Sequence, residues 1–275
     1  MNQLGLLPAI GAAVCWGSFF VPVKKVSVSD IWQLQGATGI GVILLAIPVS
    51  AWSGYQLLPS GLLGGALWAF SNLLALYAVR LIGLSRTSPF LAGFSILVSF
   101  LWGILYFHEE FRYMYLAVIA VVMLLGGLGF IANTSSGHPV RRKGYVLAAI
   151  SGLVGGSYVV PMQATHTLQA GFFSSSLAIF AFGIPLLLLS RKFMRREMLA
   201  GAISGGIFNA GSISILTAVG LIGITVAYPV SQTATLFAIS WGILYFREVV
   251  HRQGILRVIA GGALILCGAA LITIA

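Results

Sequence analysis

Polar and aromatic side chains share one face of an apolar stretch early in the sequence. Trp68 and Asn72 lie one helical turn apart in the range 58–80, and Gly61 and Gly65 continue the same face. An amide inside a hydrophobic helix is costly unless it meets a partner or water. A flat apolar ring beside a hydrogen-bonding amide suits a sugar, which has a C–H-rich face and a hydroxyl-rich edge. This face therefore predicts a binding site for a small, neutral, polar solute.

Similar polar positions recur in other apolar stretches. Asn209 shares a helix face with Ser212, and Ser95 and Ser99 are one turn apart. We predict that such side chains line one central cavity, whereas the alternative for the two asparagines is an interhelical hydrogen bond that holds the bundle together. The predicted substrate-binding residues are Trp16, Gln35, Trp68, Asn72, Ser95, Ser99, Asn209, Ser231 and Gln232.

Titratable side chains are scarce and lie at the ends of the apolar stretches. A buried proton relay normally uses Asp, Glu or His, and no carboxylate is placed at mid-membrane. One cluster on a single predicted side could admit protons, although solvated loop residues are the ordinary interpretation. This candidate proton path consists of His108, Glu109, Glu110 and His166.

The sequence contains no recognisable catalytic or metal-binding pattern. It has no phosphate-binding glycine loop, no metal-ligand cluster and no nucleophile with an adjacent base. Cys15 and Cys267 lie in apolar stretches without CxxC spacing, so neither a disulfide nor a metal site is indicated. We expect no enzymatic activity, no metal and no cofactor.

The elements that position these residues follow from composition. Of the 275 residues, 59% are hydrophobic and only 7% are charged, which lies far outside the range of soluble domains. A helix that crosses the lipid bilayer needs about 20 apolar residues. We predict an all-α polytopic membrane protein with ten transmembrane helices. They are expected at 4–23, 31–52, 58–80, 87–107, 111–132, 144–163, 170–190, 198–220, 224–246 and 254–274.

The sequence is an internal duplication. The block WGILYF begins at Trp102 and again at Trp241, and each copy carries a proline shortly after its opening glycine. Because each half holds five predicted helices, an odd number, the halves must insert with opposite orientations, which suits alternating access. We predict one integrated transmembrane domain made of two inverted five-helix repeats. The repeats are residues 1–137 and 138–275.

Positive charge is distributed unevenly between the two predicted sides of the membrane. Of the 15 Lys and Arg residues, all but Arg112 fall on one side. The positive-inside rule makes this basic side cytoplasmic and both termini external, in a multi-pass protein of the inner membrane. The same distribution argues against a nucleic-acid partner.

Several small or rigid residues recur in the two halves. We interpret the matched prolines as hinge or gating positions, with close packing through small residues as the alternative. Tryptophans near helix ends, Trp102 and Trp241, are typical of the aromatic belt. Glycines repeated every seven residues suit close packing between halves or in a homodimer. The prolines are Pro22, Pro161, Pro89 and Pro229, and the glycines are Gly254, Gly261 and Gly268.

These residues resemble the drug/metabolite transporter superfamily, and within it the glucose/ribose porter group. The resemblance rests on the inverted duplication, on WGSFFVPVKK from Trp16, and on the run from Asn72 through AVRLIGLSRTSPF. It implies secondary active transport of a monosaccharide, often coupled to protons, with polar site residues at Asn72 and at the Ser231–Gln232 pair. At Ser95 the chain departs from the group's pattern, which usually has glutamine there.

Two other functions are compatible with the sequence. An exporter of amino acids or toxic aromatic metabolites would use the Trp and Phe content to line a roomier cavity. A membrane scaffold would explain the hydrophobicity but not the matched polar faces. We predict a transporter of a small neutral polar solute, with a monosaccharide as the favoured substrate, working by alternating access.

Overall fold

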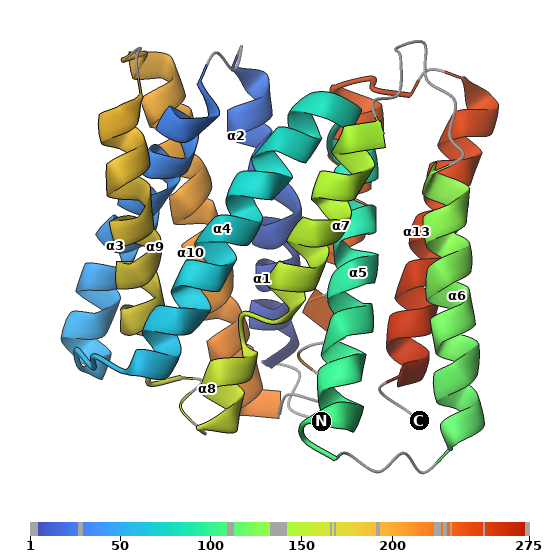
Figure 1. The fold of residues 1–275 in the computed structure, drawn as a ribbon, viewed down its shortest axis with the longest axis horizontal. Helices are drawn as coiled ribbons and strands as arrows, with labels where there is room; N and C mark the ends of the chain where they lie inside the picture. The colour runs from blue at the N-terminus through green and yellow to red at the C-terminus, as the bar shows by residue number, and fades with distance from the viewer. Residues whose placement is uncertain are drawn as a thin grey trace.

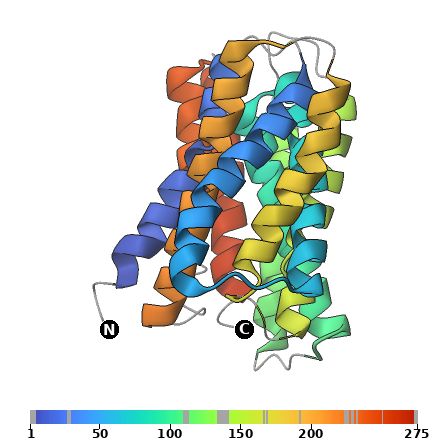
Figure 2. The same ribbon diagram turned by 90° about the vertical axis from the view of Figure 1, so that its left-hand side faces the viewer.

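The computed structural model forms a bundle of helices in the part of the chain that it describes (Figures 1 and 2). No strand occurs among these residues, so the all-α prediction is confirmed for them. The described residues are 5–26, 30–108, 113–132, 142–165, 167, 169–190, 193–222, 227, 230–231, 233–249 and 251–272.

Short connections join the helices, and local signals set several of their ends. Asp30 caps the first turn of α3, Pro59 occupies the first position of α4, and glycines with positive φ, Gly54 and Gly83, follow α3 and α4. The helices are α1 (Leu6–Ser18), α2 (Phe20–Lys25), α3 (Ile31–Ser53), α4 (Pro59–Ile82), α5 (Leu84–Leu105), α6 (Met114–Ala132), α7 (Arg142–Gly156), α8 (Val160–Ala164), α9 (Phe172–Leu189), α10 (Arg195–Ile222), α12 (Ala234–Ser240), the π-helical η2 (Trp241–Tyr245) and α13 (Arg252–Ile272).

Among the residues that the structure describes, seven helical segments are long and apolar enough to cross a membrane. Two further apolar helices, Tyr115–Ile131 and Ala234–Tyr245, are shorter. By length and composition the chain is therefore a multi-pass helical membrane protein. The seven segments are Leu6–Lys25, Ile31–Trp52, Pro59–Ile82, Leu84–Leu105, Arg142–Ala164, Phe172–Leu189 and Arg195–Ile222.

The first span of each half is interrupted near its end. α1 gives way to α2 at Phe19, and the turn at 157–159 separates α7 from α8. Pro22 and Pro161 lie just after these breaks, where each proline lacks the N–H that would continue the preceding helical turn. α5, in contrast, runs through Pro89 without a break.

Helices from the first half of the chain pack mainly against helices from the second half. Figure 2 shows α3 between α9 and α10, and both pairs are in extensive contact. α4 and α5 pack on α7, and α1 packs on α10. Glycines permit the close approach, because a Cβ at Gly205 would overlap the backbone carbonyl of Thr38.

The glycines of the last helix serve packing within the chain. α13 lies beside α6 at one edge of the bundle (Figure 1). A Cβ at Gly261 would be 2.7 Å from the carbonyl oxygen of Gly127, and one at Gly268 would be 2.8 Å from that of Ala120. Packing within the chain thus accounts for Gly261 and Gly268 without a second subunit, and a homodimer stays a prediction.

Candidate functional site

Two buried amides form the centre of the candidate site. Gln35 on α3 is 0% exposed and Asn72 on α4 is 4% exposed. The Nδ2 of Asn72 donates a hydrogen bond of 2.7 Å to the Oε1 of Gln35. Within the described part of the chain, Nε2 of Gln35 and Oδ1 of Asn72 have no hydrogen-bond partner. If both side-chain amides are flipped, the pair still has one amide NH₂ group and one amide oxygen without a partner.

The start of α3 is anchored, which fixes the position of Gln35. Asp30 accepts hydrogen bonds from the backbone N–H groups of Trp32 and Gln33, at 2.9 and 3.4 Å. Its other carboxylate oxygen accepts a bond from the Ser190 hydroxyl, beyond the end of α9, at 2.7 Å. The amide of Gln33 in turn bonds both the N–H and the carbonyl of Met194. Both halves of the chain therefore hold the turn that carries Gln35.

An aromatic cluster lies one helical turn from Asn72. Trp68 stacks on Phe208 of α10, with ring centroids 3.8 Å apart and an interplanar angle of 28°. Phe19, at the break between α1 and α2, lies 5.7 Å from the Phe208 ring, and the Trp16 indole donates to the Phe208 carbonyl at 3.3 Å. Trp16, Phe19, Trp68 and Phe208 thus bring flat apolar surface from both halves to one place.

A cavity of about 280 Å³ lies between α2, α3 and α4, close to the amide pair. Leu34 and Leu76 belong to its wall, and they are the neighbour of Gln35 and the residue one turn after Asn72. This volume is near the lower end of the range for small-molecule sites, about 300 Å³. We call this cavity the vestibule. It is lined by Val23, Lys24, Leu34, Leu76, Val79 and Arg80.

A larger hollow of about 590 Å³ lies elsewhere, along α6 and α13. Gly126, Gly129, Phe130 and Arg257 line it. Leu34 and Leu76, which adjoin the amide pair, line the vestibule and not this hollow, so we place the candidate site at the vestibule.

Three of the predicted substrate-binding residues use their donors for helix packing. The hydroxyls of Ser95 and Ser99 donate to the carbonyls of Gly152 and Gly156 on α7, at 2.9 and 3.1 Å. The Nδ2 of Asn209 donates to the Val42 carbonyl at 2.9 Å. For Asn209 this bond matches the alternative of an interhelical hydrogen bond, and the two serine bonds likewise join neighbouring helices.

The remaining predicted residues are only partly within the described part of the chain. Ser231 is fully buried, and His108 is exposed just after the end of α5. Gln232, Glu109, Glu110, His166 and Pro229 lie outside the described residues. The proton path and the hinge roles of the prolines therefore stay predictions.

The two tryptophans of the repeated block make crossed contacts that the sequence analysis missed. The indole of Trp102 donates to the hydroxyl of Ser157 at 2.9 Å. The indole of Trp241 donates to the hydroxyl of Ser18, also at 2.9 Å. Each bond joins the two halves at a break in the first span of one half, so the aromatic-belt interpretation is insufficient. The two serines are separated by the same offset as the two tryptophans, and that signal was available in the sequence.

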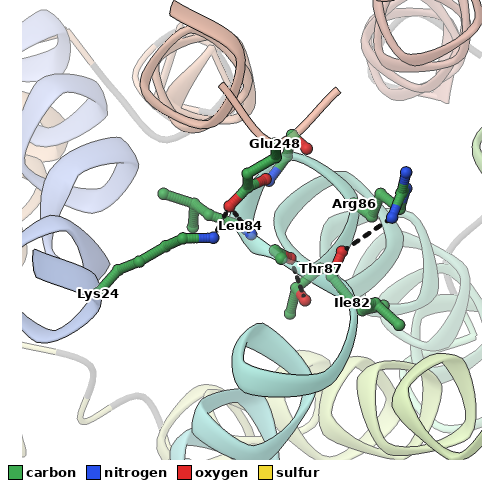
Figure 3. Close-up of polar contacts among 8 residues, drawn as sticks. Lys24, Ile82, Leu84, Arg86, Thr87 and Glu248 are labelled. Carbon is green, nitrogen blue, oxygen red and sulfur yellow. Dashed lines mark hydrogen bonds and ion pairs between the residues drawn. The ribbon is translucent and has the colours of Figure 1, made fainter. Parts of the chain in front are cut away.

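A buried charge cluster near the vestibule was also missed (Figure 3). Glu248, 8% exposed, forms an ion pair with Lys24 of α2, which is 20% exposed. The two carboxylate oxygens of Glu248 also accept hydrogen bonds of 2.6 Å from the backbone N–H groups of Leu84 and Ser85. A carboxylate at this position satisfies orphan donors of α5 and complements its dipole. The ion pair escaped prediction because its members are far apart in the sequence.

Comparisons with known proteins agree with this architecture. The sequence is 25% identical to a candidate sugar uptake protein of Listeria monocytogenes, over 99% of each chain. It is 24% identical to a candidate ribose uptake protein of Latilactobacillus sakei, over 96% of this chain and 94% of that protein. It is 25% identical to a candidate glucose uptake protein of Staphylococcus epidermidis, over 95% of each.

The fold also has a solved counterpart. A crystal structure of another protein covers 99% of this chain and 97% of its own chain, with a TM-score of 0.59 at 16% identity, which is evidence for the fold alone. A family model described as sugar transport protein matches residues 4–275. That match spans nearly the whole chain, and the chain therefore belongs to the sugar transport protein family.

Proposed function

We propose that this chain takes up a monosaccharide and binds it at Gln35 and Asn72. The observation that carries the proposal is the unused donor of Gln35 beside the unused acceptor of Asn72. A sugar hydroxyl both donates and accepts, so one hydroxyl can satisfy both groups at once. Buried polar groups without partners are costly, and a ligand that pairs with them recovers that cost.

Neighbouring side chains support a neutral polar ligand. The Trp68 ring, one turn from Asn72, offers a flat surface for the C–H-rich face of a sugar ring. No charged side chain is hydrogen-bonded to the amide pair among the described residues. Of the two cations that line the vestibule, Lys24 is compensated by Glu248 and Arg80 is exposed to solvent. An anionic substrate would favour an uncompensated cation beside the pair. The relatives' names, which concern sugar, ribose and glucose uptake, support the same class.

The proposed mechanism is alternating access between two inverted five-helix repeats, residues 1–137 and 138–275. The crossed bonds Trp102 to Ser157 and Trp241 to Ser18 support it, because the same contact occurs once in each direction. The matched breaks near Phe19 and at 157–159 also support it. Ten transmembrane helices, a cytoplasmic basic side and external termini complete the proposal. Among the described residues no carboxylate is hydrogen-bonded to the amide pair, so proton coupling would use groups elsewhere in the chain.

Sugar binding to purified protein tests the site. We expect glucose, ribose or rhamnose to change the tryptophan fluorescence of the wild type, because Trp68 lies one turn from Asn72. Gln35→Ala and Asn72→Ala should each weaken the affinity about tenfold or more. Asn209→Ala is the matched control, since its amide serves the Val42 carbonyl, and its affinity should equal that of the wild type. Wild-type affinity in both Gln35→Ala and Asn72→Ala would refute the site.

A further inference from the structure

Arg86 is a buried cation that has no ion-pair partner among the described residues. It lies in the first turn of α5, is 4% exposed, and makes one long hydrogen bond, from Nη1 to the Ile82 carbonyl at 3.4 Å. Its Nε and Nη2 have no hydrogen-bond partner in the part of the chain that the structure describes. Burying a guanidinium without a paired charge is expensive, so its retention calls for a reason.

A carboxylate is close to Arg86 but is engaged by other groups. Glu248 binds the backbone N–H of Ser85, the residue immediately before Arg86, and pairs with Lys24. In Figure 3 the Arg86 side chain points away from Glu248, on the other side of the first turn of α5. Rotation about its side-chain bonds can turn the long arginine toward the carboxylate, because that carboxylate already contacts the residue immediately before Arg86.

Lys24 connects this ion pair to the vestibule. It lines the cavity, and its ammonium also lies 5.1 Å from the centre of the Phe246 ring. Glu248 and Phe246 belong to the second half of the chain, whereas Lys24 and α5 belong to the first. The ion pair therefore holds α2 against the second half at the wall of the vestibule. If α2 moved outward to admit or release a solute, Glu248 would lose its cation.

We propose that Arg86 replaces Lys24 as the partner of Glu248 when the vestibule opens. This makes Arg86 and Glu248 positioning residues of the transport cycle, and the inference rests on the alternating access proposed above. In the closed arrangement Lys24 neutralises Glu248 while Arg86 is unpaired. In the open arrangement Arg86 neutralises it while Lys24 is released toward water. The buried carboxylate keeps a cation in both arrangements, so opening does not require an isolated buried anion.

The device is confined to one end of the molecule. The residue that corresponds to Lys24 at the offset of the repeated tryptophans is Gln163, which is uncharged and exposed. A charge exchange of this kind therefore cannot occur in mirror form at the other end. This asymmetry separates the proposal from a general property of duplicated folds.

Distances across the vestibule test the exchange in the full-length protein in lipid nanodiscs. Spin labels are placed at Lys25→Cys and His251→Cys, which are exposed on opposite sides of the ion pair, with Cys15 and Cys267 replaced by alanine. Lys24→Met should raise the ratio of the long-distance to the short-distance population about tenfold, because the closed state loses its ion pair with Glu248. Arg86→Met should lower that population ratio by a similar factor, because the open state loses the proposed ion pair between Arg86 and Glu248.

Two controls separate charge exchange from general damage. Arg86→Lys keeps the charge and should restore the wild-type distribution, while Arg196→Met removes an exposed cation from α10 and should change nothing. On a Glu248→Gln background, which needs no counter-cation, Arg86→Met should add no further shift. An unchanged ratio in Arg86→Met, a shift in the same direction as Lys24→Met, or an additive shift on Glu248→Gln would each overturn the exchange.

The same samples distinguish this proposal from the proposed function. Binding of glucose, ribose and rhamnose is measured by tryptophan fluorescence in each variant. Opposite distance shifts without any sugar binding would support the exchange and count against the sugar site. Sugar binding with the Arg86→Met distribution equal to that of the wild type would support the site and count against the exchange.

Discussion

The indole of Trp102 donates a hydrogen bond of 2.9 Å to the hydroxyl of Ser157, and this bond joins the last turn of α5 to the break between α7 and α8. Its counterpart, Trp241 to Ser18, adjoins Gly242, which packs against Ser85 in the first turn of α5. Trp102 follows Ser85 by 17 residues along α5, so the two bonds are about 25 Å apart along the bundle. The two halves are thus joined at both ends by the same pair of residue types.

Removing one indole donor should open one end of the bundle. Trp102→Phe keeps most of the ring packing but loses the bond to Ser157, which is worth about 1 kcal/mol. We expect faster maleimide labelling of a cysteine at Tyr106, beside that bond, and no change at Lys25. Trp241→Phe should give the reverse pattern. If either variant changed the labelling equally at both ends, the two hydrogen bonds would not act independently, and this interpretation would be contradicted.

Close helix packing can be tested with two adjacent glycines of α10. A Cβ at Gly205 would overlap the Thr38 carbonyl on α3, whereas a Cβ at Gly206 meets nothing within 4 Å. We expect Gly205→Ala to destabilise the protein by about 1–3 kcal/mol. Gly206→Ala should be neutral or stabilising by up to about 1 kcal/mol. Thermal unfolding in detergent measures both, and equal melting temperatures would be inconsistent with the contact between α3 and α10.

The serines of α5 provide a test of the predicted binding site. Ser95→Ala removes the hydrogen bond to the Gly152 carbonyl, so we expect a lower melting temperature and an unchanged sugar affinity. Ser99→Ala should behave in the same way through Gly156. A loss of sugar affinity as large as that of Asn72→Ala, with wild-type stability, would instead support the predicted role of these serines in substrate binding.

The orientation in the membrane is a separate prediction. Lys143, exposed at the start of α7, belongs to the basic side that we expect in the cytoplasm. In intact cells a membrane-impermeant maleimide should label Tyr55→Cys, in the loop between α3 and α4, but not Lys143→Cys. Both should be labelled after the membrane is permeabilised. The reverse pattern in intact cells would invert the topology.

Sequence patterns anticipated the helices well because apolar runs of this length have few alternatives. The expected range 31–52 coincides with α3 (Ile31–Ser53), and 58–80 with α4 (Pro59–Ile82). Gln35 and Asn72 were also predicted as site residues from sequence, since an amide within an apolar helix is costly wherever it lies, and in the structure both are buried. Their mutual hydrogen bond was not, because a helical pattern specifies the face of one helix but not its neighbour.

Contacts between distant segments account for what was missed. The ion pair of Lys24 with Glu248 depends on how α2, α5 and the segment after η2 meet, which no local pattern encodes. The identical block WGILYF, in contrast, ends with the same widened helical turn in both copies. The N–H of Phe107 bonds the Trp102 carbonyl at 3.1 Å, and the N–H of Phe246 bonds the Trp241 carbonyl at 3.0 Å.

The central claim is monosaccharide transport through the amide pair, and uptake into proteoliposomes tests it most directly. Labelled glucose, ribose and rhamnose are supplied to vesicles that contain the wild type, Asn72→Ala or Asn209→Ala, with and without an inward proton gradient. We predict uptake of at least one sugar by the wild type and by Asn209→Ala, and its loss in Asn72→Ala. Acceleration by the gradient would add proton coupling to the account. Absence of sugar uptake by folded wild-type protein, or undiminished uptake by Asn72→Ala, would contradict the claim.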